Sequence, residues 1–300
     1  MIDSGGSPEY LRAWRLAETA KDAGRLEEAV RWYAASRQAA LAEGNRELVD
    51  RALCNEAAVA VALGDGETAV LELREILVRN QSPINCFLAA YTIARAYELR
   101  RDNRKGLFYA RLARDRAAIL ERPEWLASAW NQIANFLLGD SFFGEAAETY
   151  RLAVSLLPPE ESPRQLVLAA NLAYCELMER RFDEGLRLLY RTLRTSRRRG
   201  WARSAMIAHV DLCYAHLELG RLHDAERHGR FGLALAEASG ERDWVKNALY
   251  LLGEVAVLGG ASGEGRARFK ELQTRFFPGQ PYLSDFLVNV DVRQLVNLRA

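Results

Sequence analysis

The chain has 300 residues, of which 49 % are hydrophobic and 27 % are charged, a composition that supports a large buried core and excludes an intrinsically disordered protein. Its 41 lysines and arginines nearly balance its 40 aspartates and glutamates, so net charge alone would not draw it to nucleic acid or to an anionic membrane. No apolar stretch approaches the roughly 20 residues that cross a bilayer. The first residues, MIDSGGSPEYLRAW, also lack the features of a secretory signal. We therefore expect a cytoplasmic protein.

Apolar residues recur at helical spacing along the chain, as in Leu186, Leu189 and Leu193. Seven antiparallel helix pairs are predicted in chain order at about 8–43, 46–79, 83–120, 124–157, 162–198, 201–239 and 241–277, followed by an amphipathic capping helix at 281–299. The four cysteines are far apart and form no Cys-x-x-Cys pair, which favours buried, reduced thiols over a disulfide framework. They are Cys54, Cys86, Cys175 and Cys213.

The ends of several helices are marked by local signals. Ser7, Ser82 and Ser162 each precede a proline, which places a capping hydroxyl before the first helical turn. Gln165 stands where it completes a capping box with Ser162. Breaks between the two helices of a pair are predicted at Gly24, Gly64, Gly220 and Gly259.

Two columns of small residues show that the helix pairs are repeats. The first column recurs every 37 to 40 residues early in the second helix of each pair; it consists of Ala29, Ala69, Gly106, Ala146, Gly185, Ala225 and Gly265. The second lies twelve residues before each of these anchors; it consists of Ala17, Ala57, Ala94, Ala134, Ala173, Cys213 and Gly253. Small side chains allow the two helices of a pair to approach closely, and pairs that cannot bury their own apolar faces stack into a solenoid.

These residues resemble the tetratricopeptide repeat. Leu16-Ala17 followed by Gly24, Ala29 and Tyr33 is similar to that family's pattern, and Leu172-Ala173 and Leu252-Gly253 repeat its first part. The unit of about 40 residues is longer than the usual 34 and is similar to the extended variant of peptide receptors and motor-cargo proteins. The resemblance implies an all-α, right-handed superhelical solenoid, a single repeat domain over residues 1–300, whose concave groove is lined by the first helix of each pair.

The positions expected to face this groove combine aromatic rings with amides and charges. They lie fifteen and eleven residues before the anchors, and the candidate groove residues are Tyr91, Arg95, Asn131, Asn135, Tyr174, Tyr214, Tyr250 and Glu254. Asparagine amides can pair with a peptide main chain, arginine with a carboxylate, and tyrosines supply rigid walls. The alternative is that these residues finish a solvated inner surface or contact the chain's own terminal helix.

Two further motifs have competing interpretations. Gly64, Gly66 and Ala69 match the G-x-G-x-x-A dinucleotide fingerprint, but Ala69 belongs to the anchor column and no second strand follows, so no cofactor is predicted. His209, Cys213 and His216 share one helical face and could bind a metal with His223 or His228. Packing is the favoured interpretation because Cys213 belongs to a small-residue column, and no metal is predicted. A buried histidine pair could also destabilise its repeat when protonated.

A basic stripe follows the anchor Gly185. It comprises Arg187, Arg191, Arg194, Arg197, Arg198, Arg199 and Arg203, with no acidic residue among them. The stripe could bind nucleic acid or an acidic protein, but aromatic residues are not interleaved with it as single-strand binders require. A solvated outer face is the preferred interpretation.

No nucleophile, histidine and acid are arranged as in an active site, so the chain is predicted not to be an enzyme. The sequence predicts a cytoplasmic adaptor or scaffold that holds a protein or an extended peptide in its groove. One alternative is a peptide-sensing regulatory protein, and another is nucleic-acid binding through the basic stripe Arg187–Arg203.

Overall fold

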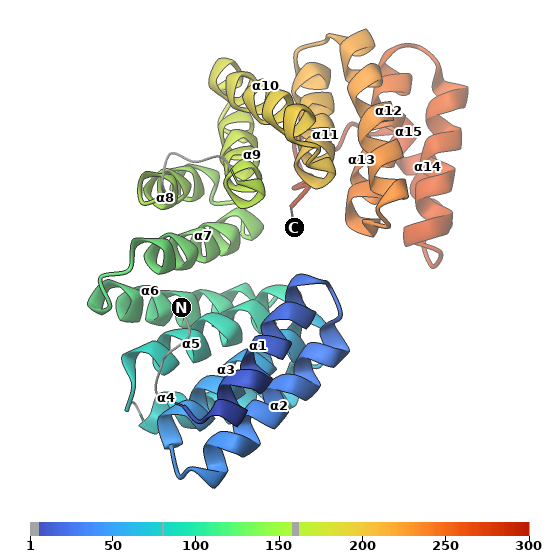
Figure 1. Ribbon diagram of the computed structural model, residues 1–300. Helices are drawn as coiled ribbons and strands as arrows, with labels where there is room; N and C mark the ends of the chain where they lie inside the picture. Colours follow the sequence, from blue (N-terminus) through green and yellow to red (C-terminus); the bar gives the residue numbers. More distant parts are fainter. Residues whose placement is uncertain (1–5, 80, 158–161, 300) are drawn as a thin grey trace. The chain divides into compact units, whose positions relative to one another are not determined.

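The computed structural model describes residues 6–79, 81–157 and 162–299, and these residues form fifteen helices and no strand (Figure 1). The helices are α1 Pro8–Asp22, α2 Leu26–Ala42, α3 Arg46–Ala62, α4 Glu67–Arg79, α5 Pro83–Leu99, α6 Asn103–Ile119, α7 Pro123–Gly139, α8 Phe143–Ser155, α9 Pro163–Met178, α10 Phe182–Arg199, α11 Ala202–Glu218, α12 Leu222–Ala238, α13 Arg242–Leu258, α14 Ser262–Phe276 and α15 Leu283–Asn289. The all-α prediction is confirmed, and each expected pair contains two helices close to the predicted bounds. None of the helices in the described part of the chain combines the length and apolar character that crossing a bilayer requires.

Gly24 and Gly220 occupy equivalent turns in two pairs. Gly24 connects α1 to α2 with a φ of 74°, and Gly220 connects α11 to α12 with a φ of 69°. Only glycine adopts this left-handed backbone without a steric penalty, so the same short sequence closes the helix in both turns. Gly64, with a φ of 95°, closes the turn between α3 and α4. The G-x-G-x-x-A match therefore belongs to a helix-to-helix turn.

The two small-residue columns meet across the helix pairs. A Cβ placed on Gly185 would lie 3.2 Å from the carbonyl oxygen of Ala173, and one placed on Gly265 would lie 3.1 Å from that of Gly253. Ala17 is completely buried at the equivalent level of the first pair. The small residues therefore let the two helices of a pair come into backbone contact, as the column pattern predicts.

The described chain groups into two compact units. Unit 1 comprises the residues up to Asp140 together with Ser155–Leu157, and unit 2 comprises Ser141–Val154 and the residues from 162 onward. Within unit 1, α3 contacts α5 and α5 contacts α7; within unit 2, α9 contacts α11 and α11 contacts α13. Helices α3, α5 and α7 thus form one layer in unit 1, and α9, α11 and α13 form one in unit 2; each layer is called the inner wall of its unit below. The single repeat domain expected over residues 1–300 stays a prediction.

The predicted helix starts and thiols are mostly confirmed. The Ser7 hydroxyl accepts a hydrogen bond from the Tyr10 N–H at 3.2 Å, and both bonds of the capping box between Ser162 and Gln165 are present. Ser82 is different, because its side chain makes no capping bond and instead donates to Glu47 Oε1 at 2.9 Å. All four cysteines are free and buried.

The predicted capping helix over 281–299 is wrong in extent. Only Leu283–Asn289 is helical, and the chain leaves the helix at Val290 in an extended conformation. Two local bonds oppose continuation of the helix: Asn289 donates its amide to the Asp285 carbonyl at 2.7 Å, and Asp291 accepts the Arg293 N–H at 3.0 Å. Residues 291–299, called the return segment below, run back to the inner wall of unit 2 instead (Figure 1).

Candidate functional site

The inner wall of unit 1 carries polar side chains from α5 and α7. Arg95 is exposed, and its guanidinium lies 3.6 Å from the Glu98 carboxylate. Asn135 donates its amide to the same carboxylate at 2.9 Å. Asn131 is half-buried and makes no hydrogen bond with the described residues. Its donor and acceptor therefore remain available to a guest.

Aromatic rings continue this wall at its other end. Tyr91 is half-buried and stacks on Phe87, with ring centroids 5.7 Å apart, and Phe87 in turn stacks on Trp125 at 4.6 Å. Gln132 fixes the spacing of the two helices by donating its amide to the Tyr91 carbonyl at 3.2 Å. Tyr91, Arg95, Asn131 and Asn135 therefore belong to a common polar and aromatic surface of unit 1.

The four candidate residues of unit 2 do not line an open groove. Tyr174, Tyr214, Tyr250 and Glu254 are all buried. Tyr174 contacts the return segment directly, Tyr250 lines a cavity together with Leu298 of that segment, and Tyr214 packs against Tyr174 with ring centroids 6.0 Å apart. The sequence also allowed that these residues contact the chain's own terminal helix. In unit 2 they do contact or lie beside the terminal segment, but that segment is not helical.

The main chain of Leu298 is held by two side chains of the inner wall. Its N–H donates to Tyr174 Oη at 2.9 Å, and its carbonyl accepts from Asn247 Nδ2 at 2.7 Å. Asn297 adds a contact of 3.4 Å between its Oδ1 and Tyr174 Oη. Bonds to backbone groups hold a segment of chain largely independently of the identity of its side chains.

Arg299 fills a pocket between two aromatic rings. Its Nη2 donates to both carboxylate oxygens of Asp211, at 2.8 and 2.6 Å. The guanidinium carbon lies 4.6 Å from the ring centroid of Tyr174 and 4.4 Å from that of Trp244. Asp211 is completely buried, and this burial raises its pKa to about 6, whereas the nearby Arg299 acts to lower it. Asp211, Tyr174 and Trp244 are called the arginine seat below.

A second acidic position receives Arg293. The guanidinium of Arg293 lies 3.3 Å from Glu218 and 4.0 Å from Glu254, and Gln294 donates to Glu218 at 3.0 Å. Burial raises the pKa of Glu254 to about 7, and Asp291 acts in the same direction. The inner wall of unit 2 is therefore acidic where the return segment is basic.

Sequence reasoning missed Asp211, Trp244 and Asn247. A usable signal exists for Asp211, because the position directly after the first groove column is polar in most repeats. Its members include Asn55, Thr92, Gln132, Asn171 and Asp211. For Trp244 and Asn247, which lie before the groove column of their helix, we find no comparable pattern in the sequence.

The histidines of the sixth pair pack together. The Nδ1 atoms of His209 and His228 are 2.9 Å apart, and His216 Nε2 lies 2.7 Å from Tyr190 Oη. Burial lowers the pKa of His209 to about 3, and His228 adds to this effect. Burial lowers the pKa of His228 to about 4, and His216 adds to this effect. Within the described residues no group of three His, Cys, Asp or Glu side chains is arranged to hold a metal ion. Cys213 faces Gly229, whose Cβ would lie 2.9 Å from the sulfur.

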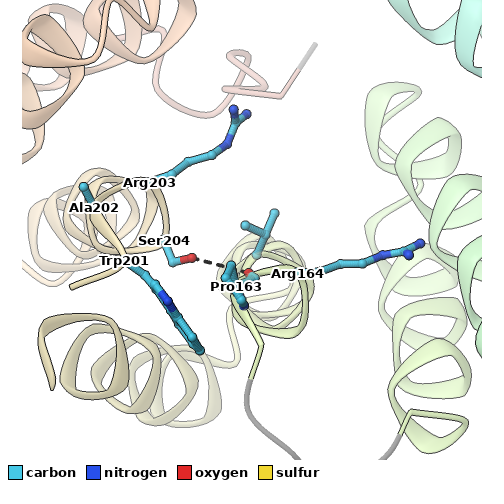
Figure 2. A pocket seen from close by; sticks show the side chains of 7 residues that line it. Pro163, Arg164, Trp201, Ala202, Arg203 and Ser204 are labelled. Atoms are coloured by element: carbon cyan, nitrogen blue, oxygen red, sulfur yellow. Dashed lines mark hydrogen bonds between the residues drawn. The ribbon is translucent and has the colours of Figure 1, made fainter. Parts of the chain in front are cut away.

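Several arginines of the basic stripe contact neighbouring side chains. Arg187 donates to Glu184 at 2.8 Å, Arg203 to Glu241 at 2.6 Å, and Arg197 approaches His209 at 3.2 Å. Figure 2 shows a shallow pocket at the starts of α9 and α11, where Ser204 bonds the Pro163 carbonyl at 3.4 Å. There the side chains of Arg164 and Arg203 extend in different directions instead of converging on one point. Nucleic-acid binding by the stripe stays a prediction.

Comparison with known proteins supports the fold. No protein-family model matches the chain, and a search of curated proteins finds no match. Among solved structures, the apo form of RapI is 12 % identical with a TM-score of 0.66, covering 88 % of this chain and 76 % of that one. A Rap protein complexed with competence and sporulation factor is 13 % identical with a TM-score of 0.64, covering 91 % and 76 %. A tetratricopeptide repeat protein from Parabacteroides merdae is 14 % identical with a TM-score of 0.55, covering 97 % and 100 %. The chain has a tetratricopeptide-like fold.

Proposed function

We propose that this chain is a scaffold that binds an extended segment of another protein, or a peptide, on the inner walls of its two units. One observation carries the proposal: the inner wall of unit 2 holds residues 291–299, because the Leu298 N–H donates to Tyr174 and the Leu298 carbonyl accepts from Asn247. A surface that binds one non-helical segment through backbone groups is chemically suited to bind another.

The inner wall of unit 1 supports the same function through side chains that are exposed or half-buried within that unit. Asn131 has an unused amide, Arg95 is exposed, and the Tyr91 ring provides an apolar contact area. These are the side-chain types that contact peptide main chains and carboxylates. The similar Rap protein that was solved in complex with competence and sporulation factor adds support, since it carries a ligand on a comparable fold.

A double substitution tests the unit 1 wall. Asn131→Ala with Asn135→Ala removes two amides, and we expect partner affinity to fall about tenfold or more, since each lost hydrogen bond contributes about 0.5–1.5 kcal/mol. Partners would be identified by mass spectrometry after capture on the immobilised chain, and their affinity measured by calorimetry with the purified partner. Gln38→Ala is the matched control, because it removes an exposed amide from α2, outside the inner wall. Equal affinity of the double variant and the control variant would contradict the proposal.

Within this function we favour an adaptor over a peptide-sensing regulator, and the captured species separates the two. An adaptor retains a folded protein, whereas a regulator retains a short peptide that changes its melting temperature on binding. Size-exclusion chromatography of the eluted complex distinguishes these outcomes directly. We propose that the protein acts in the cytoplasm. Microscopy of a fluorescent fusion would test this location.

A further inference from the structure

A cavity of about 650 Å³ lies in unit 2, lined by residues of α10, α11 and α12. Helix α11 packs against both α10 and α12, and it contributes one side chain to the lining. The rest of the lining comes from α10 and α12, which do not belong to the inner wall. Small-molecule sites have volumes of about 300–1,000 Å³, so this cavity has the size of a ligand site and is separate from the surface proposed above to bind a peptide.

Buried side chains form the floor of the cavity. They are Leu193 of α10, His209 of α11 and His228 of α12. The Nδ1 atoms of the two histidines are 2.9 Å apart, and His228 Nε2 is buried with no hydrogen-bond partner in the described structure. Burial lowers the pKa of both histidines, so their rings are neutral at neutral pH. The side chains at the rim therefore set the charge of the cavity.

Three guanidinium groups line the rim. Arg194 and Arg197 are exposed residues one turn apart on α10, and Arg227 is an exposed residue of α12. Arg227 lies 2.9 Å from the Asp224 carboxylate, and Arg197 approaches His209 at 3.2 Å. Neither Arg194 nor Arg197 pairs with a carboxylate in the part of the chain that the structure describes, so two positive charges have no counter-charge. A phosphate monoester carries a charge of about −1.5 to −2 at neutral pH and matches this excess.

An aromatic ring from each of the two outer helices also lines the cavity. Tyr190 of α10 is 38 % exposed, and Phe231 of α12 is 51 % exposed. The Tyr190 ring packs against His228 with centroids 6.1 Å apart, and the Phe231 ring packs against His209 at 5.3 Å. Each ring is thus held in place while part of its surface stays exposed. Exposed aromatic and guanidinium planes can stack on a planar ring of a ligand.

We infer that this cavity binds a small phosphate monoester that carries a planar ring, the chemistry shared by a nucleoside monophosphate and by free O-phosphotyrosine. The arginines at the rim donate N–H groups to the phosphate oxygens, since the planar guanidinium can pair two donors with two of them. The planar ring of the ligand packs against Tyr190 or Phe231. Inorganic phosphate alone would leave these aromatic side chains unused, and an uncharged ring would leave the arginines unpaired.

Isothermal titration calorimetry of the full chain in phosphate-free buffer of low salt concentration tests the inference with four probes. They are adenosine 5′-monophosphate, O-phosphotyrosine, inorganic phosphate and adenosine. We expect at least one of the first two to bind about tenfold or more tightly than inorganic phosphate, because only these probes use both the arginines and the rings. Adenosine should bind more weakly than adenosine 5′-monophosphate. The tighter of the two ringed phosphates identifies the source of the ligand.

Two substitutions separate the phosphate contact from the ring contact. Arg194→Ala removes a charged donor and should weaken binding of the tighter probe about tenfold or more. Phe231→Ala should weaken the same binding about fivefold and leave inorganic phosphate unaffected, since it removes only a ring contact. Arg191→Ala is the matched control, because Arg191 is an exposed arginine of α10 that has no partner in the described structure and does not line the cavity. All three side chains are exposed, and circular dichroism checks that each variant is folded.

Nuclear magnetic resonance of histidine-labelled protein locates the bound ligand. The signals of His209 and His228 should shift on binding, whereas that of His223, an exposed residue of α12 that does not line the cavity, should not. Four results would overturn the inference: no binding of either ringed phosphate, equal binding of inorganic phosphate, equal losses in Arg191→Ala and Arg194→Ala, or a shift at His223 alone. A single-stranded oligonucleotide without a terminal phosphate that binds more tightly than adenosine 5′-monophosphate would assign the arginines to nucleic acid instead.

Discussion

Three buried histidines in unit 2 are arranged so that their protonation has a defined physical consequence. Arg197 lies 3.2 Å from His209 Nε2 and can only donate, so that nitrogen accepts and His209 Nδ1 carries the proton directed at His228. His228 Nε2 then carries a proton with no hydrogen-bond acceptor in the described structure. Arg197, Arg227 and the other histidines surround the site with positive or neutral groups, and Asp224 is the nearby acid. Further protonation is therefore unfavourable.

We predict that His209 and His228 destabilise unit 2 in mild acid. Their pKa values in the folded chain are about 3 and about 4, whereas unfolded histidine titrates near about 6.5. The unfolded chain thus binds more protons below that pH, and the stability contributed at neutral pH is lost as pH falls. The loss at about pH 5 is about 2 kcal/mol per histidine.

Urea unfolding at neutral and mildly acidic pH checks this prediction. The control combines His209→Gln with His228→Gln, which should depend less on pH than the unaltered chain. The raised pKa values of Asp211 and Glu254 act in the opposite sense, because the folded chain holds their protons more tightly. Both carboxyl groups are present in both proteins, so their effect cancels in the comparison. Identical pH dependence would refute the assignment.

At the scale of single residues, the sequence predicted which side of its helix a residue lies on, but not which segment packs against that side. The repeat register placed Asn131 and Asn135 on one face of their helix, and both are half-buried in unit 1; their part in a binding groove stays a prediction. It assigned Tyr174 to the same layer, but the layer is covered there by residues more than a hundred positions away. Helical periodicity reports which side a residue faces within its own helix and carries no information about a distant segment that packs on it.

Helix pairs depend on small residues at their closest approach. A Cβ on Gly185 would lie 2.5 Å from Leu177 Cδ2 and 3.2 Å from the Ala173 carbonyl oxygen. The leucine side chain can move, but the backbone carbonyl cannot move without separating α9 from α10. We therefore predict that Gly185→Ala lowers the unfolding free energy by about 1–3 kcal/mol.

The matched control is Gly263→Ala in the first turn of α14. A Cβ at Gly263 meets nothing within 4 Å, so alanine should be neutral or stabilise by about 0.5–1 kcal/mol through its better helix propensity. Thermal denaturation followed by circular dichroism compares the two variants. Similar melting temperatures for both would show that the anchor column is not a packing constraint.

At the scale of elements, helices with strong periodicity and clear breaks were predictable, and the last one was not. The pattern from Pro281 onward is amphipathic, but its polar residues Asp291 and Arg293 bond locally and its basic side chains reach carboxylates on other helices. Tertiary contacts and local turns thus override a helical pattern. Ser82 shows the same limit, since its hydroxyl bonds a glutamate of α3 instead of its own helix.

The inner walls of the two units differ: that of unit 1 keeps exposed and half-buried side chains such as Arg95 and Asn131, and that of unit 2 carries the return segment. We predict that Arg299→Ala increases hydrogen exchange in α9, α11 and α13, because removing the cation leaves Asp211 buried and unpaired. Exchange in α1 to α6, all within unit 1, should not change. Mass spectrometry of the exchanged protein resolves the two regions.

Arg111→Ala serves as the control for this experiment, because Arg111 is an exposed arginine of α6 with no partner in the described structure. It should leave exchange unchanged in both units. A uniform increase throughout the chain after Arg299→Ala would mean that the substitution destabilises the protein globally, and the assignment of a local seat would then be wrong.

For the whole molecule, the repeat period predicted the number and order of the helices. The difference between the two inner walls depends on contacts between residues distant in sequence, which the repeat period does not report.

The short connection from α15 to Arg299 also sets a concentration threshold for any competitor. A tethered ligand experiences an effective concentration on the order of millimolar, so an outside chain of equal intrinsic affinity would displace it only near that level. A guest that binds this wall more tightly than the return segment does would displace it at a lower concentration. The tethered return segment would then restrict binding at unit 2 to guests of high affinity.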